Sequence, residues 1–345
     1  MIKAQSFMVP LVSDGQLHVR RFISPTPEGD LPEGLPVALL VHGLAEDGTI
    51  FYSRTGGGLA NFLAEQGFDV YVPDLRGKGR SWPEIKQLKG YRLIHAVTED
   101  LPAIIEAIQA RTTSSQQYWF GHGIGGVLLS SVLARYPEFA SQTAAAVYFG
   151  SSRTVREREV MPRGASRAVA LNALDSLALQ FARVRGSIPS SWLDIGASDE
   201  HENLQKDLLE WFAGQPWSDP ADGYHYGRTL SSKQLQPPTL YFASAEEAGY
   251  GCTQDVVDFM CEIGKHDGRT ITLGEKQGNR HNYSHISMLT HQDAWRDHFP
   301  FMLDWLLEIQ ARYSCNYPWQ PNLTESTERR AVTNAAGLTD PACVD

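Results

Sequence analysis

The clearest chemical pattern in the sequence lies at residues 117–126, which read Gln-Tyr-Trp-Phe-Gly-His-Gly-Ile-Gly-Gly. In the pattern G-x-S-x-G, the central serine occupies a strained turn between a strand and a helix and attacks an acyl carbon. Three glycines, Gly121, Gly123 and Gly125, take the patterned positions here, and Gly123 stands where the serine would be. The segment therefore predicts the frame of a site for covalent acyl chemistry from which the nucleophile is absent.

The elements around this segment are predicted from short apolar runs that alternate with helical stretches. Helices are expected where apolar residues recur at helical spacing, at 59–66, 101–108 and 127–136. Strands are expected at 36–41, 68–72, 117–120, 144–149, 239–243 and 270–273. Continuous apolar runs of this length are typical of strands that are buried on both faces. The predicted fold class is α/β, with a mostly parallel, doubly wound sheet.

The chain is expected to form one core in two parts, at residues 1–151 and 236–312, with an insertion between them. Residues 152–235 are too many for a simple crossover, so we assign them to a helical cap inserted after the sixth strand. A cap at this place would cover the carboxyl ends of the strands, where such sheets bind their ligands. Residues 313–345 lack periodicity and are expected to form an extended or disordered tail.

The predicted cap is rich in large aromatic residues, including Trp192, Trp211 and Trp217. Two interpretations are open for each of them. The ring lines an apolar substrate pocket, or it packs the cap onto the core, as large aromatic side chains commonly do.

Composition excludes several classes of partner. The formal net charge of the 345 residues is −10, which argues against nucleic acids and acidic membrane surfaces because these bind through clustered Lys and Arg. The four cysteines are scattered without metal-ligand spacing, so we expect unpaired thiols in a reducing compartment and no zinc site. The first residues do not resemble a secretory signal, and nowhere do eighteen apolar residues follow one another. We therefore expect a cytoplasmic protein with no membrane insertion, no metal and no cofactor.

Four segments in the same order resemble the α/β-hydrolase superfamily over roughly residues 10 to 310. They are His42-Gly43 after a strand, Asp74-Leu-Arg-Gly-Lys-Gly-Arg-Ser81 after the next strand, the glycine-rich turn at 121–126, and Tyr283-Ser-His-Ile-Ser-Met-Leu before a helix with Trp305. The nearest relatives by pattern resemble capped bacterial esterases and lipases. The resemblance implies an α/β-hydrolase fold with a cap after strand 6.

The resemblance also implies catalytic roles for particular residues. His285 takes the position of the base, with His281 as its main rival and with His291 and His298 also competing. The acid follows the strand at 239–243, where either Glu246 or Glu247 could supply it.

The backbone N–H groups of Leu44 and Ile124 match the oxyanion hole, supported by the neighbouring His42 and Gly43. His122 fills the variable position beside the nucleophile, where the ring is expected to pack away from the pocket.

The functional prediction is a carboxylic-ester hydrolase scaffold for an apolar acyl or aryl ester, severely impaired because Gly123 replaces the nucleophile. Glycine tolerates the unusual backbone of such a turn, so the fold should survive the change. Two alternatives are a non-catalytic, ligand-binding pseudohydrolase and water-activating or lyase-like chemistry that uses His285. Serine at this position in natural relatives would indicate an inactivated enzyme, whereas glycine would indicate a changed function.

Overall fold

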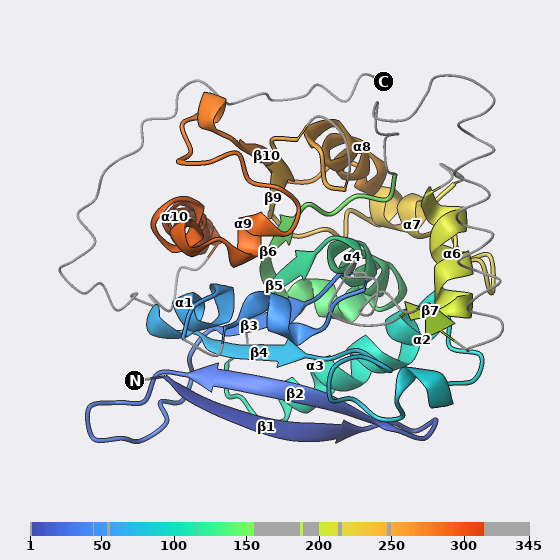
Figure 1. Ribbon diagram of the computed structural model, residues 1–345, viewed down its shortest axis with the longest axis horizontal. Coiled ribbons are helices and arrows are strands. Elements are labelled where there is room, and N and C mark those ends of the chain that lie inside the picture. Colours follow the sequence, from blue (N-terminus) through green and yellow to red (C-terminus); the bar gives the residue numbers. More distant parts are fainter. Residues whose placement is uncertain are drawn as a thin grey trace.

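A computed structural model describes the chain except for residues 1, 44, 54–55, 115, 155–186, 189–199, 213–215, 247–249 and 314–345. Its centre is an eight-stranded sheet in the order β1-β2-β4-β3-β5-β6-β9-β10 (Figure 1). The strands are β1 (Lys3–Pro10), β2 (Gln16–Ile23), β3 (Val37–Val41), β4 (Asp69–Pro73), β5 (Gln117–His122), β6 (Thr143–Phe149), β9 (Thr239–Ser244) and β10 (Gly268–Leu273). From β4 to β10 the neighbouring strands are parallel, whereas β1 and β2 form an antiparallel pair at one edge.

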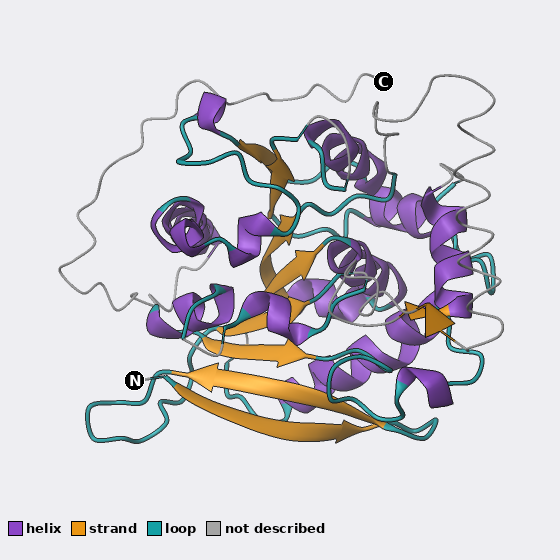
Figure 2. Ribbon diagram, in the orientation of Figure 1, coloured by secondary structure: helices purple, strands orange, loops and turns teal. Residues whose placement is uncertain are grey.

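Helices cover both faces of this sheet (Figure 2). One apolar cluster packs α1 (Leu59–Glu65), α9 (Ser287–Thr290) and α10 (His298–Tyr313) against the sheet. The opposite cluster packs α3 (Leu101–Gln109), α4 (Ile124–Arg135), α6 (Glu202–Phe212), α7 (Tyr226–Lys233) and α8 (Thr253–Ile263). This arrangement confirms the predicted α/β class, because continuous apolar strands such as Val37–Val41 are buried along their whole length.

The six expected strands are present, with ends that differ by one or two residues. The pattern missed β1 and β2, since β1 lies at the edge of the sheet and most of its side chains are exposed. The helix expected at 127–136 begins earlier, at Ile124, directly after the glycine turn. The early start matters because it brings the amino end of α4 to the candidate site.

Most of the expected cap and tail lies outside the described residues, including Trp192. The described parts of the insertion are the short pair β7 (Ser187–Ile188) and β8 (Glu200–His201), followed by α6 and α7. Trp211 and Trp217 are buried; Trp211 packs edge-to-face against Trp217 and Tyr226, and Trp217 packs against Tyr226 at a tilt of 41°. These two rings therefore pack within the core, as the second interpretation of the aromatic residues has it.

The cysteines differ from the expectation of four free thiols. Cys252 is free and buried, but Cys261 takes part in a disulfide whose partner is outside the described residues. The prediction is therefore wrong for Cys261, and the predicted cytoplasmic location loses the support that it drew from unpaired thiols. Within the described part of the chain, every helix is too short or too polar to cross a membrane.

Candidate active site

The glycine-rich segment forms a sharp turn between β5 and α4. Gly123 is the residue before the first turn of α4, and its backbone has φ of 51° and ψ of −123°. A positive φ is unfavourable for residues with a Cβ, so this position is strained for any side chain. A Cβ on Gly125 would lie 2.3 Å from the carbonyl oxygen of Val41, which explains why the helix can approach β3 so closely.

The imidazole of His285 lies beside Gly123. A Cβ built on Gly123 would stand 3.1 Å from Nε2 and 3.3 Å from Cε1 of this ring. The two residues, 162 positions apart in the sequence, are thus brought together as the motif order requires. A hydroxymethyl group on Gly123 would lie within hydrogen-bond reach of Nε2 after the ring moved by a few tenths of an ångström.

The other nitrogen of His285 faces glycines instead of a carboxylate. A Cβ on Gly150 would lie 2.4 Å from Nδ1, and one on Gly251 would lie 2.9 Å from it. Nδ1 is buried and has no hydrogen-bond partner among the described residues. Burial, and after it the positive charge of His122, lower the pKa of His285 to about 3, although the Glu46 carboxylate opposes this shift. The ring is therefore neutral near pH 7 and is a weak base.

The structure does not bring Glu246 to His285, and Glu247 lies outside the described residues. The side chain of Glu246 is exposed, while its backbone N–H donates to the hydroxyl oxygen of Ser244. Among the described residues, Nδ1 of His285 has no hydrogen-bond partner, so Glu246 does not hold the ring. The choice of Glu247 as the acid stays a prediction, because that residue lies outside the described part of the chain.

A buried ion pair supports the backbone of His285. Nδ1 of His122 lies 2.8 Å from Oε2 of Glu46, and Nε2 lies 2.9 Å from the carbonyl oxygen of His285. A carboxylate and a carbonyl both accept, so each nitrogen of His122 must donate and the ring carries a positive charge. Gly43 adds a backbone N–H bond of 2.9 Å to the same oxygen of Glu46.

The titration of this pair follows from its contacts. Burial alone would raise the pKa of Glu46, but the charge and hydrogen bond of His122 lower it to about 2. Burial would lower the pKa of His122, and the Glu46 carboxylate together with the His285 carbonyl raises it instead. The rings of His122 and His285 have centroids 4.2 Å apart, so the fully buried ring of His122 packs against the ring of the expected base. Sequence analysis missed Glu46, although a carboxylate three residues after Gly43 was a usable signal.

The other histidines of the C-terminal segment have other partners. His281 lies 2.6 Å from Asp293 and packs against His291, while His298 is buried with its Nε2 bonded to the carbonyl of Met288. Burial lowers the pKa of His298 to about 4.

In the described part of the chain, two groups of side chains have ligand atoms close enough for a metal ion, within 4.8 Å of one another. One is Glu46 with His122 and His285, and the other is His281 with His291 and Asp293. The first group fits a metal poorly, because both nitrogens of His122 already donate hydrogen bonds.

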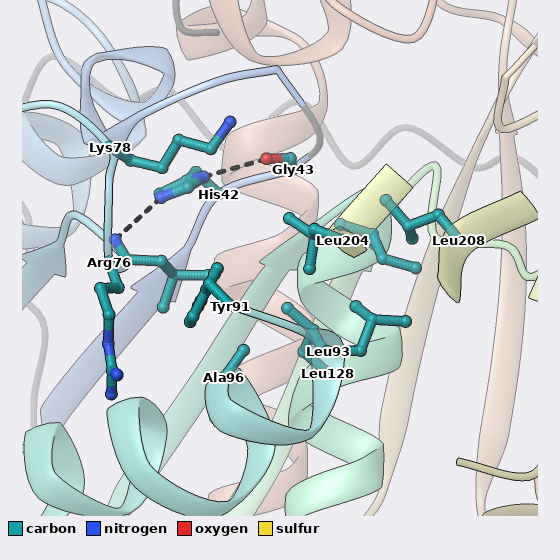
Figure 3. A pocket seen from close by; sticks show the side chains of 12 residues that line it. His42, Gly43, Arg76, Lys78, Tyr91, Leu93, Ala96, Leu128, Leu204 and Leu208 are labelled. Atoms are coloured by element: carbon teal, nitrogen blue, oxygen red, sulfur yellow. Dashed lines mark hydrogen bonds between the residues drawn. The ribbon is translucent and has the colours of Figure 1, made fainter. Parts of the chain in front are cut away.

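The loop after β3 and the amino end of α4 border a small pocket of about 20 Å³ (Figure 3). His42 is buried; its Nδ1–H donates to the carbonyl of Gly43, and its Nε2 accepts the backbone N–H of Leu75. Ile124 lies at the start of α4, where backbone N–H groups have no partner within the helix. Leu44 lies outside the described residues.

Apolar side chains form most of the pocket wall. Leu93, Leu128, Leu204 and Leu208 lie on one side in Figure 3, and Arg76 and Lys78 lie on the other. Helix α6 of the insertion contributes two of these leucines, so the insertion and the core share the pocket. Such a wall suits an apolar group that is placed next to a helix terminus able to hold negative charge.

Comparisons with known proteins agree with this arrangement. A model of the alpha/beta hydrolase fold family matches residues 36–246, more than half of the chain. Lipase 3 of Drosophila melanogaster is 25% identical over 167 residues, 44% of this chain and 42% of that protein. The tear acid lipase-like protein of Mesocricetus auratus is 31% identical over 101 residues, 27% of this chain and 25% of that protein. The chain therefore matches less than half the length of either relative.

Among solved structures, the haloalkane dehalogenase DbeA from Bradyrhizobium elkani has a TM-score of 0.55 at 18% identity. The match covers 90% of this chain and 100% of the dehalogenase. At this identity the likeness shows the fold alone. Because the family model spans the strands from β3 to β9 and the turn at Gly123 between them, the chain belongs to the alpha/beta hydrolase fold family.

Proposed function

We propose that the chain is a carboxylic-ester hydrolase scaffold for an apolar acyl or aryl ester, in which Gly123 severely impairs turnover. One observation carries the proposal: Nε2 of His285 lies 3.1 Å from the place of the missing Cβ of Gly123. A base at that distance has one evident use in this fold, which is to take the proton of a hydroxyl nucleophile.

Two further features support an ester as the ligand. The apolar pocket beside Ile124 has the character of an acyl or aryl site, and the amino end of α4 offers N–H groups where an oxyanion would form. Of the two matched relatives, one is named a lipase and the other a lipase-like protein. The ligand expected on these grounds is a small apolar ester, bound without a cofactor.

A non-catalytic binding protein is the second candidate, and the surroundings of His285 favour it. Its Nδ1 has no carboxylate partner among the described residues, and a pKa of about 3 makes Nε2 a poor proton acceptor near neutral pH. The same weakness argues against water-activating or lyase-like chemistry, since both would rely on His285 as a base.

The deciding experiment restores the nucleophile. In Gly123→Ser, hydrolysis of short p-nitrophenyl esters should rise at least about a hundredfold over the unchanged chain, a modest part of what a triad nucleophile contributes. The rise should vanish in Gly123→Ser combined with His285→Ala. Rates are measured by release of p-nitrophenol at several ester concentrations, so that kcat and KM are separated.

A matched control is Gly223→Ser. Gly223 also has a positive φ, of 73°, but a Cβ there would meet open space far from any catalytic group. This control should leave hydrolysis unchanged. A folded Gly123→Ser variant that gains no activity, and whose introduced serine does not react with a fluorophosphonate, would move the assignment to the binding protein.

A further inference from the structure

A second set of acyl-transfer residues lies at the edge of the sheet. Oδ2 of Asp74 lies 2.8 Å from Nδ1 of His18, and Nε2 of His18 lies 3.0 Å from the hydroxyl oxygen of Ser6. The three residues come from β1, β2 and the end of β4, which lie side by side at the bottom of Figure 1. Serine, histidine and aspartate are thus linked in the order that nucleophilic catalysis requires.

Asp74 determines which nitrogen of His18 donates in this series of hydrogen bonds. Its carboxylate is almost fully buried and also accepts the backbone N–H groups of Gly48 and Arg80. Burial would raise the pKa of Asp74, but the hydrogen bond from His18 and the two backbone bonds lower it. An ionised carboxylate only accepts, so Nδ1 of His18 donates to Asp74, and in the neutral form of the ring Nε2 accepts from Ser6.

Hydrogen bonds also fix the backbone of His18, and with it the position of the imidazole. The N–H of His18 donates to the hydroxyl oxygen of Ser81, and that hydroxyl donates to the carbonyl of Asp74. The N–H of Asp74 donates in turn to the carbonyl of His18. His18 is only 2% exposed, so the base is positioned before any ligand arrives.

Ser6 is accessible, and a cation lies near it. Ser6 is exposed on β1, the outermost strand of the sheet. Arg20 is its direct partner in the register of β1 and β2, so the two side chains share one face of the sheet. Arg20, on the neighbouring strand β2, is half-buried, and its guanidinium lies over the ring of Tyr52, 4.6 Å from its centre. Its charge suits an oxygen that becomes negative when Ser6 attacks.

We propose that Ser6, His18 and Asp74 form a second nucleophilic site, separate from the turn at Gly123, which takes acyl or phosphonyl groups from small reactive esters. The Ser6 hydroxyl oxygen bonds to the acyl carbon and its proton passes to Nε2 of His18. The ester C–O bond breaks, and the leaving alcohol takes that proton. Water then hydrolyses the acyl-serine, so that ester and water become acid and alcohol. With a fluorophosphonate, the P–O bond forms, the P–F bond breaks and fluoride leaves with the proton.

The test labels the unchanged chain, which has no serine at the turn. The chain is incubated with a fluorophosphonate, and the modified residues are located by peptide mass spectrometry. Ser218 is the matched control, because its hydroxyl lies 2.7 Å from Nδ1 of His225 but no carboxylate holds that ring among the described residues. Ser6 should react at least about ten times faster than Ser218. Labelling should disappear from this peptide in Ser6→Ala, drop in His18→Gln and persist in Ser218→Ala.

A second measurement does not depend on a buried substitution. Ser6→Cys changes an exposed position and Ser218→Cys a half-buried one, and the rate of their alkylation by iodoacetamide is followed by intact mass. A thiol whose proton is accepted by an oriented imidazole should react at least about ten times faster at Ser6→Cys than at Ser218→Cys. Equal rates at the two positions, or equal fluorophosphonate labelling of Ser6 and Ser218, would overturn the proposal. Labelling of Ser6 that is unchanged in a folded His18→Gln variant would do the same.

Discussion

The turn at Gly123 and the sheet edge at Ser6 each have some of the features that nucleophilic catalysis requires, and each lacks what the other has. The turn has the pocket and the helix terminus, but within the described residues its base has neither a nucleophile nor a carboxylate on Nδ1. The edge has serine, base and acid in hydrogen-bond contact, but it lies on an open strand. Backbone features, such as a helix end or a glycine turn, persist when a side chain is lost, whereas chemistry depends on particular side-chain atoms.

The two regions also orient a histidine in different ways. His18 is held through its ring by Asp74, whereas His285 is held through its carbonyl by the charged ring of His122. The carboxylate of Asp74 accepts a hydrogen bond from the ring of His18, whereas the positive charge of His122 adds to burial in lowering the pKa of His285. Variants of Glu46, His122 and Ser81, each with a control, test this contrast through measurements of stability and of imidazole titration.

The largest effect is expected when the ion pair below His285 is broken. Glu46→Gln leaves a buried imidazolium without its counter-charge and should lower the free energy of unfolding by about 3 to 5 kcal/mol. Glu202→Gln, in the partly exposed helical pair with Lys206, should lower it by no more than about 0.5 kcal/mol. Urea denaturation at pH 7 measures both. Equal and small losses of unfolding free energy in the two variants would show that the Glu46 pair is solvated.

The pH dependence of the stability of Glu46→Gln tests how the ionised Glu46 carboxylate contributes to folding. The pKa of Glu46 is about 2 in the folded chain against an ordinary value of 4.5, so its stabilisation is present above pH 4.5 and is lost as the pH falls towards 2. The loss of stability between pH 4.5 and 2 should therefore be smaller in Glu46→Gln. A parallel decline in both proteins would contradict the assignment.

An intermediate effect is expected on the titration of His285. His122→Gln removes a positive charge next to this ring and should raise its pKa from about 3. His298 serves as an internal control, because its pKa of about 4 has burial as its largest cause and should change little. Titration of the imidazole signals by NMR follows both residues. A fixed pKa for His285 would mean that burial alone sets its value.

The smallest effect separates the reactive serine from its neighbour. Ser81→Ala removes a buried hydroxyl that bonds the N–H of His18 and the carbonyl of Asp74, which should cost about 1 to 3 kcal/mol of stability. Ser6→Ala changes an exposed hydroxyl and should cost about 0.5 kcal/mol. Thermal or urea denaturation compares the two. A large loss of stability in Ser6→Ala would indicate that the Ser6 hydroxyl mainly stabilises the packing of β1 on the sheet.

Sequence patterns predicted the features that depend on residues close together in the chain. The apolar runs at Val37–Val41 and Thr143–Phe149 identified buried strands, and the glycine spacing identified the turn at Gly123. Motif order correctly paired Gly123 with His285 in space. These successes share a cause, since burial of a whole strand and a tight turn both leave a signature in neighbouring residues.

The remaining features depend on contacts between distant segments. Glu46 and His122 are 76 positions apart, and His18 and Asp74 are 56 apart, so no spacing rule connects them. The orientation of Nδ1 in His285 is set by the backbone at Gly150 and Gly251, which no motif describes. A buried polar contact of this kind is decided by packing, after the elements have already formed.

The support of His285 through its carbonyl has an evolutionary consequence. The groups that hold the ring in place, His122 and Glu46, are neither the nucleophile nor its acid, so selection on hydrolysis can lapse without disturbing the imidazole. Substitution of Glu46 or His122 would leave an unpaired buried charge, so both residues are constrained by folding as well as by any chemistry at the site. In such an arrangement a serine at Gly123 can be lost or regained by one substitution, with a shift of the His285 ring by only a few tenths of an ångström.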